Sequence, residues 1–157
     1  MMKLLTLILP FLFFLSCQNQ PGTKETTDST DNKPATTPSI EGTWELIGYY
    51  NYANDEVTDS FKTNNGYRQI KMYTPTKVMW SKDVPQDSTE WFGYGNYTAN
   101  DSTLVEVLEY GSASMSNIIE SKKEFKYELK LGKDKFSQIE LDDEGNRIYS
   151  ENYKRIE

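Results

Sequence analysis

Short runs of alternating apolar and polar residues cover most of the chain from Ile40 onward. A two-residue period is typical of β-strands that bury one face and expose the other. In the clearest run, 123–131, Phe125 and Tyr127 share one face with two leucines, and charged residues occupy the other face. The pattern predicts eight strands, at about 43–52, 66–73, 77–82, 90–98, 103–110, 123–131, 135–141 and 147–156.

The connections between these strands are alternately short and long. Tight turns are predicted at 74–76, 99–102 and 132–134, and long loops at 53–65, 83–89 and 111–122. In an up-and-down arrangement, alternate connections lie at the same end of the sheet. The chain is therefore predicted to be an all-β protein, a closed antiparallel up-and-down β-barrel of eight strands. One end of this barrel would be plain, and the other would be open and carry the long loops.

Two of the long loops contain apolar residues at helical spacing. These residues are Val57 and Phe61 in 54–63, and Met115, Ile118 and Ile119 in 112–122. Spacings of three and four residues predict short amphipathic helical turns at the open end. Such turns would either form a lid over the mouth of the barrel or plug it, and the sequence leaves both alternatives open.

The first and last predicted strands bring three residues together at the plain end. In a closed barrel these two strands pair, so Trp44 on the first strand and Arg155 on the last should meet. An arginine over a tryptophan ring gives a cation–π contact worth about 0.5 to 2 kcal/mol. Gly42 would let the chain turn in beneath the ring. We therefore predict that Gly42, Trp44 and Arg155 form the structural closure of the barrel.

The inner face is predicted to be rich in aromatic side chains. The candidates are Trp44, Tyr50, Trp80, Trp91, Tyr97, Tyr110, Phe125, Tyr127, Phe136, Tyr149 and Tyr153. An eight-stranded barrel is just wide enough to be filled by side chains or to hold one small ligand. So many rings could fill it, whereas the glycines within the strands, at 48, 93 and 95, would leave room.

The residues before the barrel have a different composition. Residues 1–16 contain Lys3 and then a short apolar run, which predicts a secretory signal rather than a membrane-spanning helix. Cys17, the single cysteine of the chain, follows in "FLSC", which resembles the lipobox of bacterial lipoproteins. That resemblance implies an acylated Cys17; the alternative is an ordinary signal peptide with an incidental thiol. Residues 17–39 are predicted to be a flexible linker, and 40–157 the barrel domain.

Several short motifs, in order along the chain, resemble the lipocalin family and its small bacterial members carried by Gram-negative lipoproteins. The motifs are "GTWEL" at 42–46, Trp80 in "TPTKVMW", Gly95-Asn96-Tyr97, "TLVEVLEYGS" at 103–112 and Tyr153-Lys154-Arg155. The resemblance spans about 41–157. The chain lacks the cysteine pair and the long C-terminal helix of vertebrate lipocalins. The resemblance implies binding of a small apolar or amphipathic molecule.

The composition argues against several other functions. The chain has no histidine, which excludes histidine-based acid–base catalysis, Ser-His-Asp triads and histidine-ligated metals. It has no phosphate- or dinucleotide-binding motif, and the acidic turn 142–146 lacks the ligand spacing of a calcium loop. A formal net charge of -7 without a basic stripe argues against nucleic-acid binding. We expect no enzymatic activity, no cofactor and no metal site.

Two functions from different classes remain. The first is a monomeric lipoprotein, anchored in the cell envelope at the outer membrane of a Gram-negative bacterium, that binds a small hydrophobic or amphipathic molecule inside the barrel. The candidate ligand-binding residues are Tyr50, Gln69, Trp80, Trp91, Glu106, Tyr127, Gln138 and Glu151. Ligand binding predicts a cavity of at least a few hundred Å³. The second is a filled barrel that acts through its outer face as a protein-interaction module.

Overall fold

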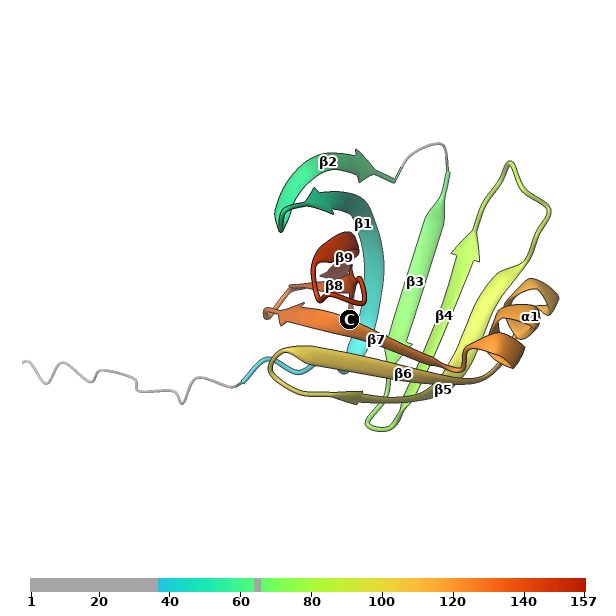
Figure 1. Ribbon diagram of the computed structural model, residues 1–157. Helices are drawn as coiled ribbons and strands as arrows, with labels where there is room; N and C mark the ends of the chain where they lie inside the picture. The colour runs from blue at the N-terminus through green and yellow to red at the C-terminus, as the bar shows by residue number, and fades with distance from the viewer. Residues whose placement is uncertain (1–36, 64–65) are drawn as a thin grey trace, which may run out of the picture. The chain divides into compact units, whose positions relative to one another are not determined.

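The computed structural model describes residues 37–63 and 66–157. The predicted signal segment, Cys17 and the linker up to residue 36 lie outside the described residues. The described residues form nine strands and one helix (Figure 1). These are β1 (Gly42–Ala53), β2 (Glu56–Lys62), β3 (Arg68–Tyr73), β4 (Lys77–Asp83), β5 (Trp91–Ala99), β6 (Thr103–Gly111), α1 (Ala113–Ser121), β7 (Glu124–Leu131), β8 (Lys135–Leu141) and β9 (Arg147–Arg155).

All of the strands belong to one antiparallel sheet that closes on itself as a ring. The strand order is β2-β1-β3-β4-β5-β6-β7-β8-β9, and β1 also pairs with β9. The first part of β1 pairs with β3, from Gly42 to Glu45, and its second part pairs with β2, from Gly48 to Ala53. The predicted all-β antiparallel class is confirmed, and each predicted strand range overlaps one strand of the structure.

The helical turn predicted in 54–63 is wrong, because this segment forms strand β2. Asn54 and Asp55 have φ angles of 52° and 61°. Two consecutive positive φ angles are the signature of a tight hairpin turn that matches the twist of its flanking strands. The turn sends the chain back along β1, where Phe61 pairs with Tyr49 and Val57 with Tyr52. The sheet therefore has nine strands instead of the predicted eight.

The second predicted helical segment is present as α1. Its N-cap is Ser112, whose hydroxyl accepts a hydrogen bond from the Met115 backbone N–H at 3.3 Å. A serine at this position satisfies a backbone donor that the helix itself leaves unpaired. Met115 and Ile119 are buried on the face of α1 that packs against β5 and β6. None of the described helices is long and apolar enough to cross a membrane.

Two bulges reverse the alternation of inward and outward residues. In β1, Leu46 pairs with Tyr153 and Gly48 with the preceding residue of β9, so one extra residue lies between them. Tyr49 then points inward, and Tyr50 is 39% exposed instead of facing the interior. A similar irregularity in the β5–β6 pairing leaves Tyr110 56% exposed. Both inward predictions were wrong because a bulge shifts a strand by one residue.

The plain end of the ring is closed by a tryptophan and an arginine. Trp44 is fully buried, and the Arg155 guanidinium carbon lies 4.0 Å from the centroid of its ring. The indole N–H donates to the Ile40 carbonyl at 2.7 Å, and Phe136 packs edge-on with ring centroids 4.8 Å apart. Arg155 also donates to the Glu41 carbonyl at 2.6 Å. These contacts join the start of β1 to the end of β9.

Gly42 is required at this closure for two reasons. Its φ of 127° is a conformation that residues with a side chain rarely adopt. A Cβ at this position would also lie 2.5 Å from an Arg155 guanidinium nitrogen and 2.5 Å from the Glu157 carbonyl oxygen. The glycine therefore lets the two ends of the folded chain approach closely.

We predict that Trp44→Ala lowers the free energy of unfolding by about 3 to 5 kcal/mol, because it removes a buried ring and leaves a cavity. Phe61→Ala, at a half-exposed ring on β2, is the control and should change stability by about 0.5 kcal/mol or less. Urea denaturation followed by circular dichroism measures both values. Equal losses in the two variants would contradict the role assigned to Trp44.

Candidate functional site

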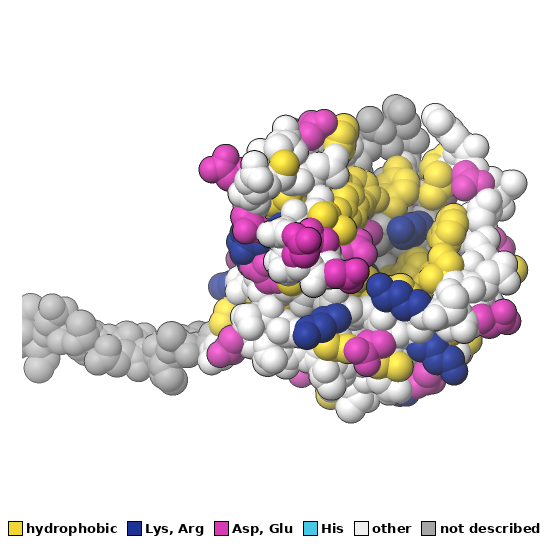
Figure 2. Space-filling view, in the orientation of Figure 1, with side chains coloured by type: hydrophobic (Ala, Val, Ile, Leu, Met, Phe, Trp, Pro, Cys, Tyr) yellow, Lys and Arg dark blue, Asp and Glu magenta, His cyan; other side chains and the backbone are white. Residues whose placement is uncertain are grey.

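A cavity of about 190 Å³ opens inside the ring at the end opposite Trp44. It is lined by Gln69, Lys71, Trp80, Lys82, Trp91, Glu106, Leu108, Met115, Ile118, Phe125, Tyr127, Gln138 and Glu151. The surface is hollowed over β3 and β4, with hydrophobic side chains along the hollow and basic side chains in and beside it (Figure 2). The cavity is smaller than the few hundred Å³ that ligand binding predicts.

Seven of the eight ligand-binding candidates line this cavity, and Tyr50 does not. Sequence reasoning missed the two lysines, Lys71 and Lys82. Both could have been found from the two-residue period. Lys71 lies on the same face of β3 as Gln69, and Lys82 lies on the same face of β4 as Trp80. Phe125 was predicted to face inward, and Met115 and Ile118 belong to the predicted apolar face of 112–122.

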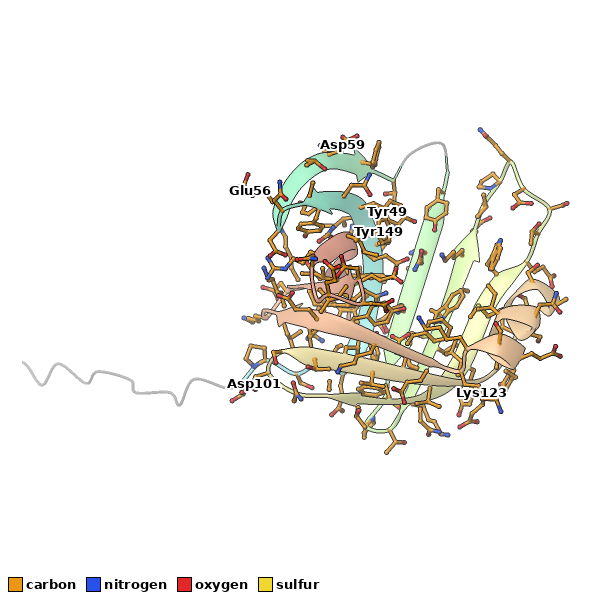
Figure 3. All side chains as sticks on the ribbon, viewed as in Figure 1. Tyr49, Glu56, Asp59, Asp101, Lys123 and Tyr149 are labelled. Carbon is orange, nitrogen blue, oxygen red and sulfur yellow. The ribbon has the colours of Figure 1, made fainter. Side chains whose placement is uncertain are left out.

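The strands and the helix place the apolar lining. Trp80 pairs across the sheet with Gly93, and a Cβ on Gly93 would lie 2.9 Å from the indole. Gly93 therefore leaves the space that the Trp80 ring occupies. Helix α1 follows β6 directly and adds Met115 and Ile118 to the wall of the cavity. Lys123, which follows the helix, and Asp101, in the turn between β5 and β6, mark opposite ends of the structure (Figure 3).

A buried ion pair lies at the inner end of the cavity. The Lys71 ammonium is 2.8 Å from Glu106 Oε1, and their side chains are 3% and 2% exposed. Lys71 also donates to Gln138 Oε1 at 2.7 Å, and the Tyr73 hydroxyl donates to the same Glu106 oxygen at 2.6 Å. Buried charges are tolerated where opposite charges and hydrogen bonds compensate for lost water. These contacts therefore hold Lys71 and Glu106 in fixed positions.

A second carboxylate continues this network. Glu151 Oε2 accepts hydrogen bonds from the Gln138 and Gln69 side-chain amides, at 2.9 and 3.2 Å, and from the Tyr153 hydroxyl at 2.5 Å. The Gln69 amide also donates to Tyr153 at 2.7 Å. Gln138 therefore joins the two clusters, since its oxygen accepts from Lys71 and its nitrogen donates to Glu151.

Tyrosine side chains extend the network toward the mouth of the ring. The Tyr67 hydroxyl donates to Gln69 Oε1 at 2.8 Å and accepts from the Tyr49 hydroxyl at 2.7 Å. The Tyr49 ring stacks on Tyr149, with centroids 5.6 Å apart, and the two rings lie side by side where β1 meets β9 (Figure 3). Tyr49 thus takes the inward position that the alternation had assigned to Tyr50.

Some polar atoms of the cavity are left without protein partners. Among the described residues, no hydrogen bond reaches Glu106 Oε2, Glu151 Oε1 or the Tyr127 hydroxyl, and Lys82 is 3.9 Å from Glu151 Oε1. No side-chain polar atom in this part of the chain is both buried and unpartnered, so these atoms are accessible to solvent. The cavity therefore presents two carboxylate oxygens and a hydroxyl to any molecule that enters it.

Burial keeps the nearby tyrosines protonated. Desolvation, with the negative charge of Glu106 and Glu151 as the next cause, raises the pKa of Tyr73, Tyr127 and Tyr153 well above the ordinary value of 10. Their hydroxyl groups are therefore hydrogen-bond donors at neutral pH. Within 37–63 and 66–157, no three acidic, cysteine or histidine residues lie together as a metal site.

A larger hollow, of about 550 Å³, lies at the other end of the ring. It is bounded by residues 37–41, by Pro75, by the turn 98–101 and by Tyr97 and Leu131. Most of its lining side chains are exposed. No ion pair of the described residues joins two of its lining residues. The smaller cavity is the stronger candidate because its charged groups are buried and held in fixed positions.

Comparison with known proteins identifies no relative: no family model, no curated protein sequence and no solved structure matches the chain.

We predict that Lys71→Met lowers the free energy of unfolding by about 3 to 5 kcal/mol, because it leaves Glu106 buried without its cation. The double variant Lys71→Met/Glu106→Gln should recover most of this loss, since a glutamine can still accept from Tyr73 and carries no charge. Urea denaturation of the single and double variants gives the coupling energy. A double variant as unstable as the sum of the two single variants would contradict the pairing.

Proposed function

We propose that this protein is a lipocalin-like carrier or sensor that holds one small amphipathic molecule in the cavity at the loop end of an eight-stranded up-and-down barrel. The eight strands would be β1 and β3 to β9, with β2 as an added hairpin arm on β1. One observation carries the proposal. Two carboxylates and a hydroxyl with unpartnered oxygen atoms face an aromatic-lined cavity, beside a buried ion pair.

The buried ion pair supports binding because stability alone does not account for it. Replacing a buried salt bridge by well-packed apolar residues is often neutral or stabilising. A ring built only to be stable would therefore favour apolar side chains at positions 71 and 106. Pockets for small molecules instead combine an apolar lining with a few fixed polar groups that orient the ligand. The network around Lys71, Glu106 and Glu151 provides such groups at one end of the cavity.

The size of the cavity limits the ligand. Drug-sized molecules occupy pockets of about 300 to 1,000 Å³. An apolar cavity of about 150 Å³ holds benzene, and the present cavity measures about 190 Å³. The ligand is therefore about the size of one ring with a short polar substituent. The ring would contact Trp80, Trp91 and Phe125, and the substituent would reach Glu106 or Glu151.

Binding is a better fit than catalysis. The chain has no histidine, and its single cysteine is Cys17, outside the barrel domain. The tyrosines beside the cavity are held in their protonated form, which suits hydrogen bonding and not nucleophilic attack. The cavity lining thus offers shape, aromatic contact area and hydrogen bonds, with no cofactor required.

A second candidate, the protein-interaction module, is favoured by an apolar stripe on the outer face. Met72, Met79, Tyr94 and Tyr110 are consecutive cross-strand partners on β3, β4, β5 and β6. Both methionines are 41% exposed, and the two tyrosine rings lie 5.1 Å apart. Contiguous exposed apolar side chains are typical of surfaces that contact other proteins. This candidate requires no ligand in the cavity, so the ligand experiment below separates the two.

We predict that protein gently purified from its own host carries a noncovalently bound small molecule, detectable in native mass spectrometry as an added mass that is lost when the protein is denatured. Ile118→Trp should remove this added mass, because Ile118 lines the cavity and a larger side chain there would fill it. Ile148→Trp is the matched control, since Ile148 is also partly exposed but lies on β9 away from the cavity lining. It should keep the added mass.

Two results would contradict ligand binding in the cavity. An unaltered protein with the same mass under native and denaturing conditions would favour the interaction module. A noncovalent added mass that survives Ile118→Trp would place the ligand elsewhere on the protein.

The membrane anchor is a separate proposal that rests on the sequence alone. The apolar run before Cys17 supports export and acylation of that cysteine, with 18–39 as a tether to the cell envelope. We predict that radiolabelled palmitate enters the protein in its host and that Cys17→Ala abolishes the labelling. Cys17→Ala should also move the protein from the membrane fraction to the soluble fraction. Unchanged membrane retention would contradict the anchor.

A further inference from the structure

Four charged side chains line the cavity, and they differ in how firmly they are held. Lys71, Glu106 and Glu151 are fixed by short hydrogen bonds, and their side chains are 3%, 2% and 12% exposed. Lys82 is 28% exposed and stands at the rim. The three fixed groups carry one positive and two negative charges, so together they leave the cavity one negative charge in excess. Lys82 supplies the balancing positive charge.

The ammonium of Lys82 sits in surroundings that suit an organic cation. It lies 5.5 Å from the centroid of the Trp80 ring and 3.9 Å from Glu151 Oε1. An aromatic face together with a carboxylate is a common way for proteins to bind ammonium groups. At 3.9 Å the ammonium makes an ion pair but no hydrogen bond with Glu151. The side chain is long and flexible, so this contact can be exchanged for another at low cost.

We propose that the ligand carries a positively charged amine. When no ligand is bound, the Lys82 ammonium occupies the position of this amine, over Trp80 and beside Glu151. The inference rests on the proposed function and adds the chemical class of the ligand. On binding, the ligand's ammonium would displace the Lys82 ammonium into solvent. It would then donate hydrogen bonds to Glu151 Oε1 and, where its length permits, to Glu106 Oε2. The ring of the ligand would lie among Trp91, Phe125 and Tyr127.

The arrangement of donors and acceptors argues against an anionic ligand. The amide groups of Gln69 and Gln138 already donate to partners inside the network, and Lys71 donates to Glu106 and Gln138. The carboxylate atoms that stay accessible are acceptors. A bound anion would lie beside two carboxylates in a partly dehydrated space, which is unfavourable. The formal net charge of -7 also draws cations to the protein.

The experiment compares three probes that share a phenyl ring and differ in charge: 2-phenylethylammonium, 2-phenylethanol and phenylacetate. Isothermal titration calorimetry measures their binding to the full chain and to Lys82→Met, which keeps an apolar stem of similar length. The unaltered protein should bind the ammonium about tenfold more tightly than the alcohol. Lys82→Met should bind the ammonium still more tightly, by several-fold, because no side-chain cation competes for the site.

Two further variants complete the test. Lys130→Met removes an exposed lysine of β7 that does not line the cavity, and it should leave all three affinities unchanged. Glu151→Gln should reduce ammonium binding about tenfold and change alcohol binding little, because it removes one charge that only the ammonium uses.

The outcomes separate this inference from the proposed function. Equal binding of ammonium and alcohol, preferential binding of phenylacetate, or weaker ammonium binding to Lys82→Met would overturn the cationic ligand. Each of these results would leave binding in the cavity intact. If no probe binds to either protein, the amine inference also fails. Native mass spectrometry of the host-purified protein then decides independently whether the cavity holds any ligand.

Discussion

The pairing of β1 with β9 is the constraint on which the rest of the structure depends. It turns an open sheet into a ring, so that alternate residues of every ring strand face a common interior. At one end the pairing is reinforced by the Arg155 guanidinium over the Trp44 ring. The same guanidinium donates hydrogen bonds to backbone carbonyl groups before β1. Closure explains why charged residues such as Lys71 and Glu106 are buried. Their positions on the strands point inward, and in a closed ring every inward position faces the interior.

Among the described residues, every fully buried side-chain polar atom has a hydrogen-bond partner, and this compensates for the loss of water around the polar interior. Gln138 has the central role, because its side-chain amide accepts a hydrogen bond from Lys71 and donates one to Glu151. It therefore joins a cluster that needs an acceptor to one that needs a donor. An apolar residue at this position would leave Glu151 with fewer donors, while an acid would add a third negative charge. The network thus specifies residue types at several inward positions. This specificity distinguishes the loop end of the ring from the apolar end around Trp44 and Phe136.

Alternation predicted most of the sheet, and seven of the eight ligand-binding candidates chosen from it line the cavity, because inward positions follow directly from a two-residue period. It failed where the backbone departs from that period. Bulges in β1 and between β5 and β6 turned Tyr50 and Tyr110 outward, and a bulge leaves no clear mark in a single sequence. Val57 and Phe61 were wrongly predicted to lie on a helical turn, because a spacing of four residues fits one face of a strand as well as one face of a helix. The hairpin turn at Asn54 and Asp55 makes this segment a strand that pairs with β1.

The cavity and the short β1–β3 pairing, called here the seam of the ring, are connected by the same side chains. The last pair between β1 and β3 is Glu45 with Ile70, after which β1 turns to β2. Beyond that point the Tyr49–Tyr67 hydrogen bond spans from β1 to the residue before β3, and the chain of bonds continues through Gln69 to Glu151. Movement at the seam would therefore shift a carboxylate that faces the cavity. For this reason the tyrosines, although they do not line the cavity, help to determine the geometry of the site.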